Sequence, residues 1–516
     1  MGNVIFDTNL LCIQKRDSSL AKRISDAVSN GYYAHTRPAK TGFLVPHSAD
    51  GIAFHSMYDP VREGRSLIDS VTRVSFLVFA GIGGAFHVTE FLSRFPEGHC
   101  IIAESGYASF RSLIELIDLS AILSDPRVAV FPDCTEDSLV RLLPHLYIPV
   151  IQGDFRLLSL RPWQMQNRKQ NEILERNIHS ALTQVSSDFS VQAHFGRLWM
   201  RNCVQNLKAA GNMQGTFPNF DKKKTAVVIA AGPSLEHHLK ELRTHRDAYI
   251  IFTTDTAFST LFDSGIQADI FVSIDAQSVS VSHVMHPVPP GMLVILDICG
   301  NPGIVRRARE CGAAVIFASG GHPLAEYASS FSALPKIHTA SGTVTLAALD
   351  AAHSLGFTNV ALLGADFAYL GGKPYARGTY LASLYGKNAA RYSPEELSYC
   401  SLIFRTPVTR IEGPRGLTYT TDTLERYARA NTIFTPNNRW TPDMFNPFPA
   451  EAFLRKYRED LENLLINNTM DNGILYTILP FLSWCTENKI RPESPKNRQD
   501  TIQLALDLIA GYTDVS

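Results

Sequence analysis

Several common signals are missing from this 516-residue sequence, and each absence excludes a class of protein. No run approaches the roughly 18 consecutive apolar residues that a membrane-spanning helix needs. The 48 basic and 49 acidic residues nearly cancel, so the chain has no overall positive field for nucleic acid or an anionic membrane. Eight scattered cysteines without a C-x-x-C motif argue against a zinc ribbon and a disulfide scaffold. Because residues 1–16 also lack the layout of a secretion signal, we expect a reducing, cytoplasmic location.

Catalytic signatures with fixed spacing are missing as well. The sequence has no H-E-x-x-H, no G-x-S-x-G and no Walker A motif, so a metal hydrolase, a serine esterase and a P-loop NTPase lack their usual support. The histidines are dispersed, and no protein ligand set for a metal is predicted. The composition, 45% hydrophobic and 19% charged, is that of a globular protein. At roughly 150 residues per domain, the length predicts two to four domains.

Apolar runs of strand length alternate with helical patterns over much of the chain, which predicts an α/β protein with parallel sheets. We predict several domains, the central one being a Rossmann-like parallel sheet. They are a β-rich lead-in (1–65), an N-terminal Rossmann-like domain (66–165), a helical linker (166–215), the central domain (216–440) and a C-terminal helical domain (441–516). The predicted strands are 74–80, 100–104, 128–131 and 146–151, then 226–230, 249–252, 270–274, 293–296, 314–317 and 359–363.

The most informative local feature follows the first strand of the central domain. Residues 227–236 read Val-Val-Ile-Ala-Ala-Gly-Pro-Ser-Leu-Glu, a strand that runs into Gly232 and a helix start at Pro233. Proline suits the first helical turn because its missing N–H would be unpaired there. Glycine lets the backbone approach a ligand, and a helix N-terminus presents free N–H groups to an anion. The turn therefore predicts a phosphate contact, with a plain strand-to-helix turn as the alternative.

Polar residues also follow other strands of this sheet, at the edge where ligands bind in open α/β sheets. Four strand ends carry hydroxyls, carboxylates and glycines, which together favour a nucleotide site. The residues assigned to ligand binding are Ala231, Gly232, Pro233, Ser234, Leu235, Thr254, Asp255, Ser273, Ser341, Gly342, Thr343, Gly364 and Phe367. The loop that follows Gly364 is rich in glycine, tyrosine and basic residues, a composition suited to closing over a phosphorylated ligand.

A weaker signal lies in the N-terminal Rossmann-like domain. Gly81-Ile-Gly-Gly84 follows one strand, and Glu104 ends the next. This spacing imitates a dinucleotide or S-adenosylmethionine site, in which the acid holds ribose hydroxyls. A purely structural Rossmann-like unit explains the same residues equally well.

Four segments of the central domain, taken in order, resemble the motility accessory factor family, bacterial proteins implicated in attaching nonulosonic acids to flagellin. They are 229–235 (Ile-Ala-Ala-Gly-Pro-Ser-Leu), 271–277 (Phe-Val-Ser-Ile-Asp-Ala-Gln), 339–344 (Thr-Ala-Ser-Gly-Thr-Val) and 363–369 (Leu-Gly-Ala-Asp-Phe-Ala-Tyr). Residues 79–91 fit the same family, and the likeness spans about 70–460. The central domain is also similar to bacterial sialyltransferases, which use a CMP-activated sugar, and to archaeal hydroxymethylpterin diphosphokinases.

The resemblance implies an inverting glycosyltransferase that moves a nonulosonic acid, such as pseudaminic or legionaminic acid, from a CMP donor to Ser or Thr of flagellin. It implies a role in filament assembly and motility, with the CMP-sugar and flagellin as partners and no required cofactor. Tyr369 and Tyr375 would then contact the donor phosphate, and Asp275 or Asp366 would be a base or a ribose contact. A Mg²⁺-dependent diphosphokinase acting on a small heterocycle such as a pterin, and a noncatalytic flagellin-binding protein, stay open as alternatives.

Two departures from the sialyltransferase pattern bear on the site. Asp255 and Asp275 stand where that fold has Asn after the second and third strands, which leaves the nucleotide preference open. The sialyltransferases also place a general-base His shortly before a Thr-Asp helix start, and no His precedes Thr421-Asp422 in residues 413–420. Another residue would therefore have to deprotonate the acceptor.

Overall fold

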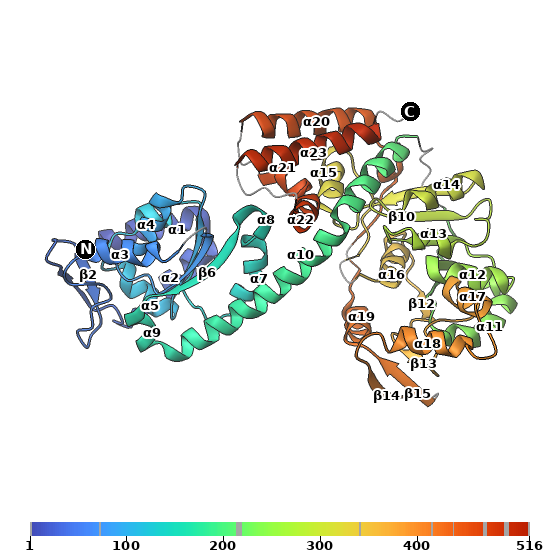
Figure 1. The fold of residues 1–516 in the computed structure, drawn as a ribbon, viewed down its shortest axis with the longest axis horizontal. Helices are drawn as coiled ribbons and strands as arrows, with labels where there is room; N and C mark the ends of the chain where they lie inside the picture. Colours follow the sequence, from blue (N-terminus) through green and yellow to red (C-terminus); the bar gives the residue numbers. More distant parts are fainter. Residues whose placement is uncertain are drawn as a thin grey trace. The chain divides into compact units, whose positions relative to one another are not determined.

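The computed structural model describes residues 3–71, 74–212, 219–339, 342–413, 416–436, 438–467, 472–489 and 495–513. The chain is α/β, as predicted, and forms two compact units, Met1–Val191 and Gln192–Ser516 (Figure 1). Within the described ranges, no helix combines the length and the apolar character that crossing a membrane requires.

The first unit is built on a four-stranded parallel sheet with the strand order β5-β4-β3-β6. Its strands are β3 (Val74–Ala80), β4 (His99–Ala103), β5 (Val128–Phe131) and β6 (Asp154–Ser159). Three of the four predicted strands are confirmed, but the one expected at 146–151 is wrong. Those residues end helix α7 (Ser138–Leu146) and form the short helix α8 (Pro149–Gln152), because Pro149 is suited to a first helical turn.

The expected β-rich character of residues 1–65 is also wrong. Three helices dominate this segment, beside one two-stranded antiparallel hairpin. The elements are α1 (Val4–Arg16), α2 (Ser18–Asp26), β1 (His35–Pro38), β2 (Leu44–His47) and α3 (Pro60–Asp69). Asn3 and Asp17 cap the first two helices by accepting hydrogen bonds from Phe6 N (3.2 Å) and Leu20 N (2.8 Å).

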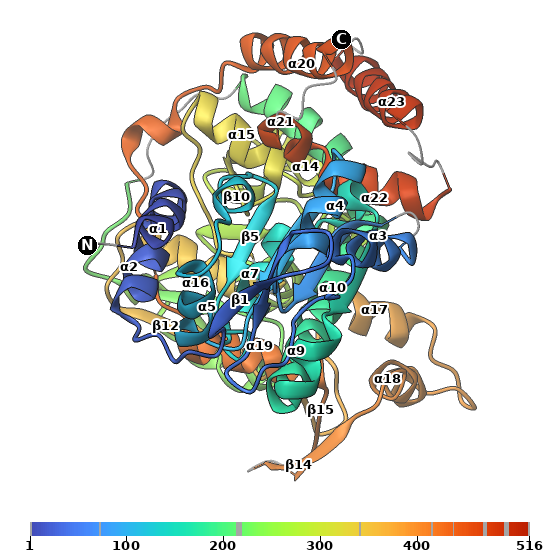
Figure 2. The same cartoon turned by 90° about the vertical axis from the view of Figure 1, so that its left-hand side faces the viewer.

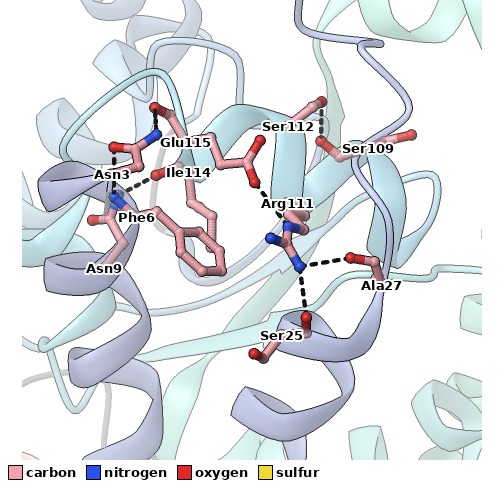
Figure 3. Close-up of polar contacts among 10 residues, drawn as sticks. All are labelled: Asn3, Phe6, Asn9, Ser25, Ala27, Ser109, Arg111, Ser112, Ile114 and Glu115. Carbon is pink, nitrogen blue, oxygen red and sulfur yellow. Dashed lines mark hydrogen bonds and ion pairs between the residues drawn. The ribbon is translucent and has the colours of Figure 1, made fainter. Parts of the chain in front are cut away.

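Polar contacts hold these N-terminal helices on α5 (Tyr107–Ile114) (Figure 3). Asn9 Nδ2 donates to Ile114 O at 2.9 Å, and Arg111 Nη1 donates to Ser25 O at 2.6 Å and Ala27 O at 2.7 Å. The remaining helices of this unit are α4 (Phe86–Arg94), α6 (Ser120–Leu123) and α9 (Arg161–Gln166). The lead-in is thus packed on the sheet-and-helix core of its unit instead of forming a separate β element.

The second unit is built on a six-stranded parallel sheet with the order β11-β10-β9-β8-β7-β12. Its strands are β7 (Thr225–Ile229), β8 (Tyr249–Thr254), β9 (Ile270–Ser273), β10 (Leu293–Asp297), β11 (Ala314–Ala318) and β12 (Val360–Leu363). All six predicted strands are confirmed to within two residues. The core lies between this sheet and α16 (Val344–Ser354), whose alanines at 347, 348, 351 and 352 are buried against it.

Helices connect and flank these strands. They are the part of α10 (Arg168–Ala210) from residue 192 onward, whose earlier part belongs to the first unit, then η1 (Pro233–His237), α11 (Leu239–Thr244), η2 (Arg246–Ala248), α12 (Asp255–Asp263), α13 (Val279–His283), α14 (Pro302–Glu310), α15 (Pro323–Phe331), α17 (Tyr380–Lys387), α18 (Glu395–Ile403) and α19 (Asp422–Ile433). The helices predicted over 166–210 form the single helix α10, apart from its short neighbour α9. Most of the boundary predicted at 211–218 lies outside the described residues.

A small antiparallel sheet, with the order β13-β15-β14, follows the central sheet in the chain. Its strands are β13 (Tyr369–Leu370), β14 (Thr409–Gly413) and β15 (Gly416–Thr420), and the β14–β15 hairpin extends away from the six-stranded sheet (Figure 2). The described residues after 441 are helical, as predicted: η3 (Pro442–Phe445), α20 (Ala450–Asn467), α21 (Asn472–Thr477), α22 (Leu479–Glu487) and α23 (Pro495–Thr513).

Candidate functional site

The first strand-to-helix turn of the six-stranded sheet packs directly on the loop that follows its last strand. Gly232 N donates to Gly364 O at 2.7 Å, and Ser234 N donates to Oδ2 of Asp366 at 2.8 Å. A Cβ atom on Gly232 would lie 2.5 Å from both acceptor atoms. Glycine is therefore needed here for contact between two segments of the chain, and the Ser234 N–H already has an anionic partner.

This geometry narrows how the turn could bind a phosphate. Pro233–His237 form a 3₁₀-helix instead of the first turns of an α-helix, and Ala231 and Leu235 on either side of Pro233 are buried. A phosphate that used the Ser234 N–H would have to displace the Asp366 carboxylate. The phosphate contact stays a prediction, and the structure explains Gly232 without it.

Asp255 and Ser273 form a buried hydrogen-bonded pair where β8 and β9 end. Ser273 Oγ donates to Oδ2 of Asp255 at 2.7 Å, and Thr256 N donates to its Oδ1 at 2.7 Å. Burial raises the pKa of the Asp255 carboxyl, while His283 and the hydrogen bond from Ser273 act in the opposite direction. Thr254, the residue before Asp255, is buried at the N-cap position of α12. A buried carboxyl with a raised pKa at a strand end is suited to holding a proton or a ribose hydroxyl.

Asp275 follows β9 and is more accessible than Asp255. Its Oδ1 accepts a hydrogen bond from Gln277 N at 2.8 Å, and its carbonyl oxygen accepts one from Asn301 N at 3.0 Å. The carboxylate is therefore held in a turn at the same edge of the sheet, half-buried and within reach of a ligand there.

The glycine-rich loop after Asp366 is fastened to η1. Lys373 Nζ pairs with Oε2 of Glu236 at 3.3 Å, and Arg377 N donates to its Oε1 at 3.0 Å. Ala376 N also donates to Ala231 O at 2.9 Å. The lysine charge is thus partly neutralised by a carboxylate of the protein, and a closing motion of this loop would have to release these contacts.

Of the two predicted tyrosines, Tyr375 interacts electrostatically with both Tyr369 and Asp255. Tyr369 begins β13 and pairs with Tyr419 of β15, while Tyr375 lies in the loop that follows. Burial raises the pKa of Tyr375, and the Tyr369 hydroxyl and Asp255 add to this effect, whereas Arg405 opposes it. The structure therefore groups residues from separate strand ends, and the Tyr375 hydroxyl stays protonated as a hydrogen-bond donor at neutral pH.

Two residues between β12 and β13 have a left-handed backbone conformation. Gly364 has φ +69°, and a Cβ atom there would overlap Ala230 O, so only glycine fits. Phe367 has φ +46°, a left-handed conformation that costs a non-glycine residue roughly 1–2 kcal/mol. Strained backbone held by its surroundings is a recurrent property of ligand-binding segments.

The predicted residues before α16 are only partly described. Thr343 caps α16 by accepting a hydrogen bond from Thr345 N at 3.3 Å, and Gly342 has φ +74°. The Cβ position of Gly342 lies 3.5 Å from the hydroxyl oxygen of Tyr427. Ser341 lies outside the described residues. The Thr343 hydroxyl therefore has a structural role as a helix cap.

Sequence reasoning missed two polar groups near this edge. Asp297 ends β10, its Oδ1 accepts a hydrogen bond from Cys299 N at 2.6 Å, and burial raises its pKa to about 7. His283 ends α13, and its Nδ1 is enclosed without a hydrogen-bond partner in the described part of the chain. The pattern that selected Asp255, a carboxylate directly after a buried run, would also have found Asp297. No sequence signal marks His283.

In the first unit, the acid at the end of β4 is fully used by the protein itself. Glu104 accepts hydrogen bonds from Tyr33 Oη (2.8 Å), Ile82 N (2.9 Å) and Trp163 Nε1 (2.9 Å), and it is completely buried. The Trp163 ring also occupies the position that a side chain at Gly81 would take. Side chains thus fill the place where the ribose would lie in a dinucleotide or S-adenosylmethionine site, which favours the structural interpretation of this unit.

Comparison with known proteins places the chain in a family. A family model described as 6-hydroxymethylpterin diphosphokinase MptE-like matches residues 198–372. An uncharacterized protein of Treponema pallidum (strain Nichols) is 37% identical over 250 residues, which cover 48% of this chain and 86% of that protein. A second protein of the same strain is 37% identical over 164 residues, covering 32% and 78%. The chain belongs to the family of these treponemal proteins.

A solved structure extends the likeness beyond the MptE-like domain. The MAf glycosyltransferase from Magnetospirillum magneticum AMB-1 aligns with a TM-score of 0.54 and 14% identity, over 98% of this chain and 94% of that one. At this identity the match shows a shared fold. The resemblance predicted from the sequence, to motility accessory factors with an MptE-like domain, is thereby confirmed in its family model and its fold.

Proposed function

We propose that this MptE-like protein is a glycosyltransferase that moves a nonulosonic acid from a CMP donor to Ser or Thr of flagellin. The observation that carries the proposal is the fold, which nearly the whole chain shares with a MAf glycosyltransferase. The polar groups at the carboxyl edge of the six-stranded sheet, where ligands of open α/β sheets bind, support a donor site there. Asp255, Asp275 and Tyr375 are its central residues.

The proposed reaction is a displacement at the anomeric carbon of the sugar. The acceptor hydroxyl oxygen forms a bond to this carbon, the bond from the carbon to the CMP phosphate oxygen breaks, and the hydroxyl proton passes to a carboxylate. Negative charge grows on the departing phosphate, so a positioned donor such as the Tyr375 hydroxyl binds the transition state more strongly than the ground state.

Of the two acids predicted as the base, the geometry favours Asp275. Asp366 accepts the Ser234 N–H and lies against Gly232, so it holds the turn together. Asp275 is bound to its own turn through one oxygen and is half-buried. We therefore assign Asp275 to the acceptor proton and Asp366 to positioning of the η1 turn.

A diphosphokinase is the second candidate, because the matching family model carries that description over residues 198–372. Such an enzyme would bind ATP with Mg²⁺ at the same edge and transfer pyrophosphate to the hydroxyl of a small heterocycle such as a pterin. Carboxylates are ligands that Mg²⁺ accepts, and Asp255 and Asp275 would be the nearest candidates.

One pair of assays separates these functions. The purified full-length chain is incubated with a CMP-nonulosonic acid and flagellin of the source organism, and in parallel with ATP, Mg²⁺ and a hydroxymethylpterin. The transferase releases CMP and increases the mass of flagellin, whereas the diphosphokinase releases AMP. Binding of flagellin without either product would indicate the noncatalytic accessory protein and overturn both enzymes.

Matched variants assign any activity to this site. Asp275→Asn removes the proposed base and should abolish product formation, while Asp247→Asn, an exposed position after α11, serves as the control with unchanged rate. Mass spectrometry of flagellin from a strain lacking the gene tests the role in the cell. An unchanged flagellin mass would remove flagellin as the acceptor.

A further inference from the structure

Three metal-ligating side chains from separate elements meet inside the second unit. Cys203 lies on α10, Cys299 lies two residues after β10, and His322 caps the N-terminus of α15. One ligand atom of each lies within 4.8 Å of the other two. In the ranges that the structure describes, no other group of three or more His, Cys, Asp or Glu side chains has this spacing.

The two cysteines of this cluster are buried, whereas His322 is partly exposed. Cys203 is 0% exposed and Cys299 is 5% exposed. The ring centroids of Trp199 and His322 lie 6.0 Å apart in an edge-on arrangement. Nε2 of His322 is enclosed and has no hydrogen-bond partner among the residues that the structure describes. A buried polar nitrogen without a partner is rare in folded proteins, and it requires either a bound species or another source of stability.

Hydrogen bonds fix the cysteines relative to each other. Asn202, the neighbour of Cys203, donates to Cys299 O at 3.0 Å and to Ala276 O at 3.1 Å. Asn206, one turn further along α10, donates to Ile298 O at 2.8 Å and to Gly300 O at 2.9 Å. These amides bind the helix that carries Cys203 to the backbone of the turn at 298–300 that carries Cys299.

We propose that Cys203, Cys299 and His322 bind one zinc ion that joins α10 to the carboxyl edge of the six-stranded sheet. Two thiolates and an imidazole form a ligand set that zinc accepts in proteins, and tetrahedral geometry needs ligand atoms within a few ångströms of one another. Binding forms two zinc–sulfur bonds and one zinc–nitrogen bond and releases the two thiol protons. Water takes the fourth position.

The hydrogen bonds of His322 determine how its ring would act as a ligand. Nδ1 accepts the backbone N–H of Leu324 at 3.2 Å, so in the metal-free chain the proton of the neutral ring is on Nε2. When Nε2 binds zinc, this proton moves to Nδ1, and the long capping hydrogen bond is exchanged for a zinc–nitrogen bond.

Zinc content of the full-length chain tests the proposal directly. The reduced protein is loaded with zinc, freed of excess ion by gel filtration, and analysed by inductively coupled plasma mass spectrometry. We expect one zinc per chain in the parent and almost none in the Cys203→Ser/Cys299→Ser double variant. Cys485→Ser is the matched control, because Cys485 is equally buried in α22, and it should keep the full zinc content.

A histidine variant distinguishes ligation from packing. In His322→Asn the side-chain oxygen can still cap α15, but the Nε2 ligand is lost. We expect its zinc affinity to fall by roughly 100-fold or more, since even the loss of a supporting residue commonly costs 10–100-fold. Cobalt(II) substitution adds a spectroscopic test, because thiolate-to-cobalt charge-transfer bands appear only when sulfur binds the ion, and they should vanish in the double cysteine variant.

Three results would overturn the proposal. They are a folded parent chain that retains no zinc, a double cysteine variant that retains it, and cobalt(II) bound without charge-transfer bands. A mass lower by two hydrogens in the natively purified parent chain, but not in the Cys203→Ser/Cys299→Ser double variant, would show a Cys203–Cys299 disulfide in place of the zinc site and would also overturn the proposal. Circular dichroism of each variant confirms that loss of zinc is not loss of fold.

Discussion

Replacing Glu104 tests whether the Rossmann-like acid of the first unit is structural or binds a ribose. Glu104→Ala leaves three buried donors without an acceptor: Tyr33 Oη, Ile82 N and Trp163 Nε1. Each unpaired buried donor costs about 1–3 kcal/mol. Burial raises the pKa of Glu104, which means that the buried charge is itself unfavourable, so removing it offsets part of this cost. We therefore expect the free energy of unfolding of the first unit to fall by about 3–5 kcal/mol.

Glu104→Gln separates the two carboxylate oxygens. The glutamine oxygen can still accept from Tyr33 and Ile82, but its NH₂ group then faces the N–H groups of Trp163 and Ser105, so the buried Trp163 donor and the partly buried Ser105 donor lose their acceptor. We expect a loss of about 1–3 kcal/mol, smaller than that of Glu104→Ala. Glu97→Ala, at an exposed position between α4 and β4, is the control and should change the free energy by less than about 0.5 kcal/mol.

Hydrogen exchange measured by mass spectrometry is the appropriate assay, because peptides from β3 and β4 report the opening of the first unit alone. Thermal unfolding with S-adenosylmethionine and with NAD completes the test, and neither ligand should raise the melting temperature of the parent chain. A loss below about 1 kcal/mol for Glu104→Ala, or a ligand-dependent rise in melting temperature, would refute the structural role.

Three further predictions concern other sites. Tyr375→Phe and Tyr369→Phe should each lower kcat with the CMP-sugar, by roughly 10²–10³ for a hydroxyl that donates a hydrogen bond to the leaving phosphate, while the affinity for the CMP-sugar stays nearly unchanged. A double variant that glycosylates flagellin at the parent rate would contradict this prediction. Burial lowers the pKa of His87 to about 3, so its protonation favours the unfolded chain as pH falls below about 6.5. Urea unfolding should show that protonation linked to His87 costs the parent chain about 1.4 kcal/mol of stability per pH unit between pH 6 and 4, and that His87→Leu removes this loss. The same pH dependence of stability in both chains would argue against burial of a neutral His87 ring. Gly232→Ala should lower the free energy of unfolding, measured by calorimetry, by about 1–3 kcal/mol, because the new Cβ atom meets Asp366. Gly511→Ala in α23 is the control, because the space at its Cβ position is open, and it should be neutral or stabilising. Equal effects of the two substitutions would rule out the close contact at Gly232.

The Gly232 turn shows how a correct motif can receive an incomplete explanation. The sequence indicated that backbone must come close to something at Gly232, and it does. The neighbour is Asp366, 134 residues later in the chain, whose carboxylate takes the Ser234 N–H that a phosphate was expected to use. Strand propensity and a glycine-proline pair are local signals, whereas the partner of an N–H group depends on which distant segment packs there.

The same division explains the errors at residues 1–65 and 146–151. Short alternating runs favoured strands, but Asn3 and Asp17 cap two helices that bind α5 through Asn9 and Arg111. This contact cannot be recognised from either segment alone. At 146–151 an apolar run resembled a buried strand, yet Pro149 begins a helical turn and the strand that pairs with β3 starts at Asp154. Apolar runs of this length are compatible with both states, and tertiary packing selects between them.

By itself the sequence determined the α/β class, the six strands of the second unit and the edge at which their polar residues gather, because each depends on a run of apolar residues that is long enough to be recognised locally. Only the tertiary structure decided which polar side chains contact one another within the chain. It joined Asp255 to Ser273, used Glu104 to bind Tyr33 and Trp163, and brought Cys203, Cys299 and His322 together from three elements. Hydrogen-bond partners and metal ligands are chosen by distance in space, and distances between residues a hundred positions apart are set only when the elements pack.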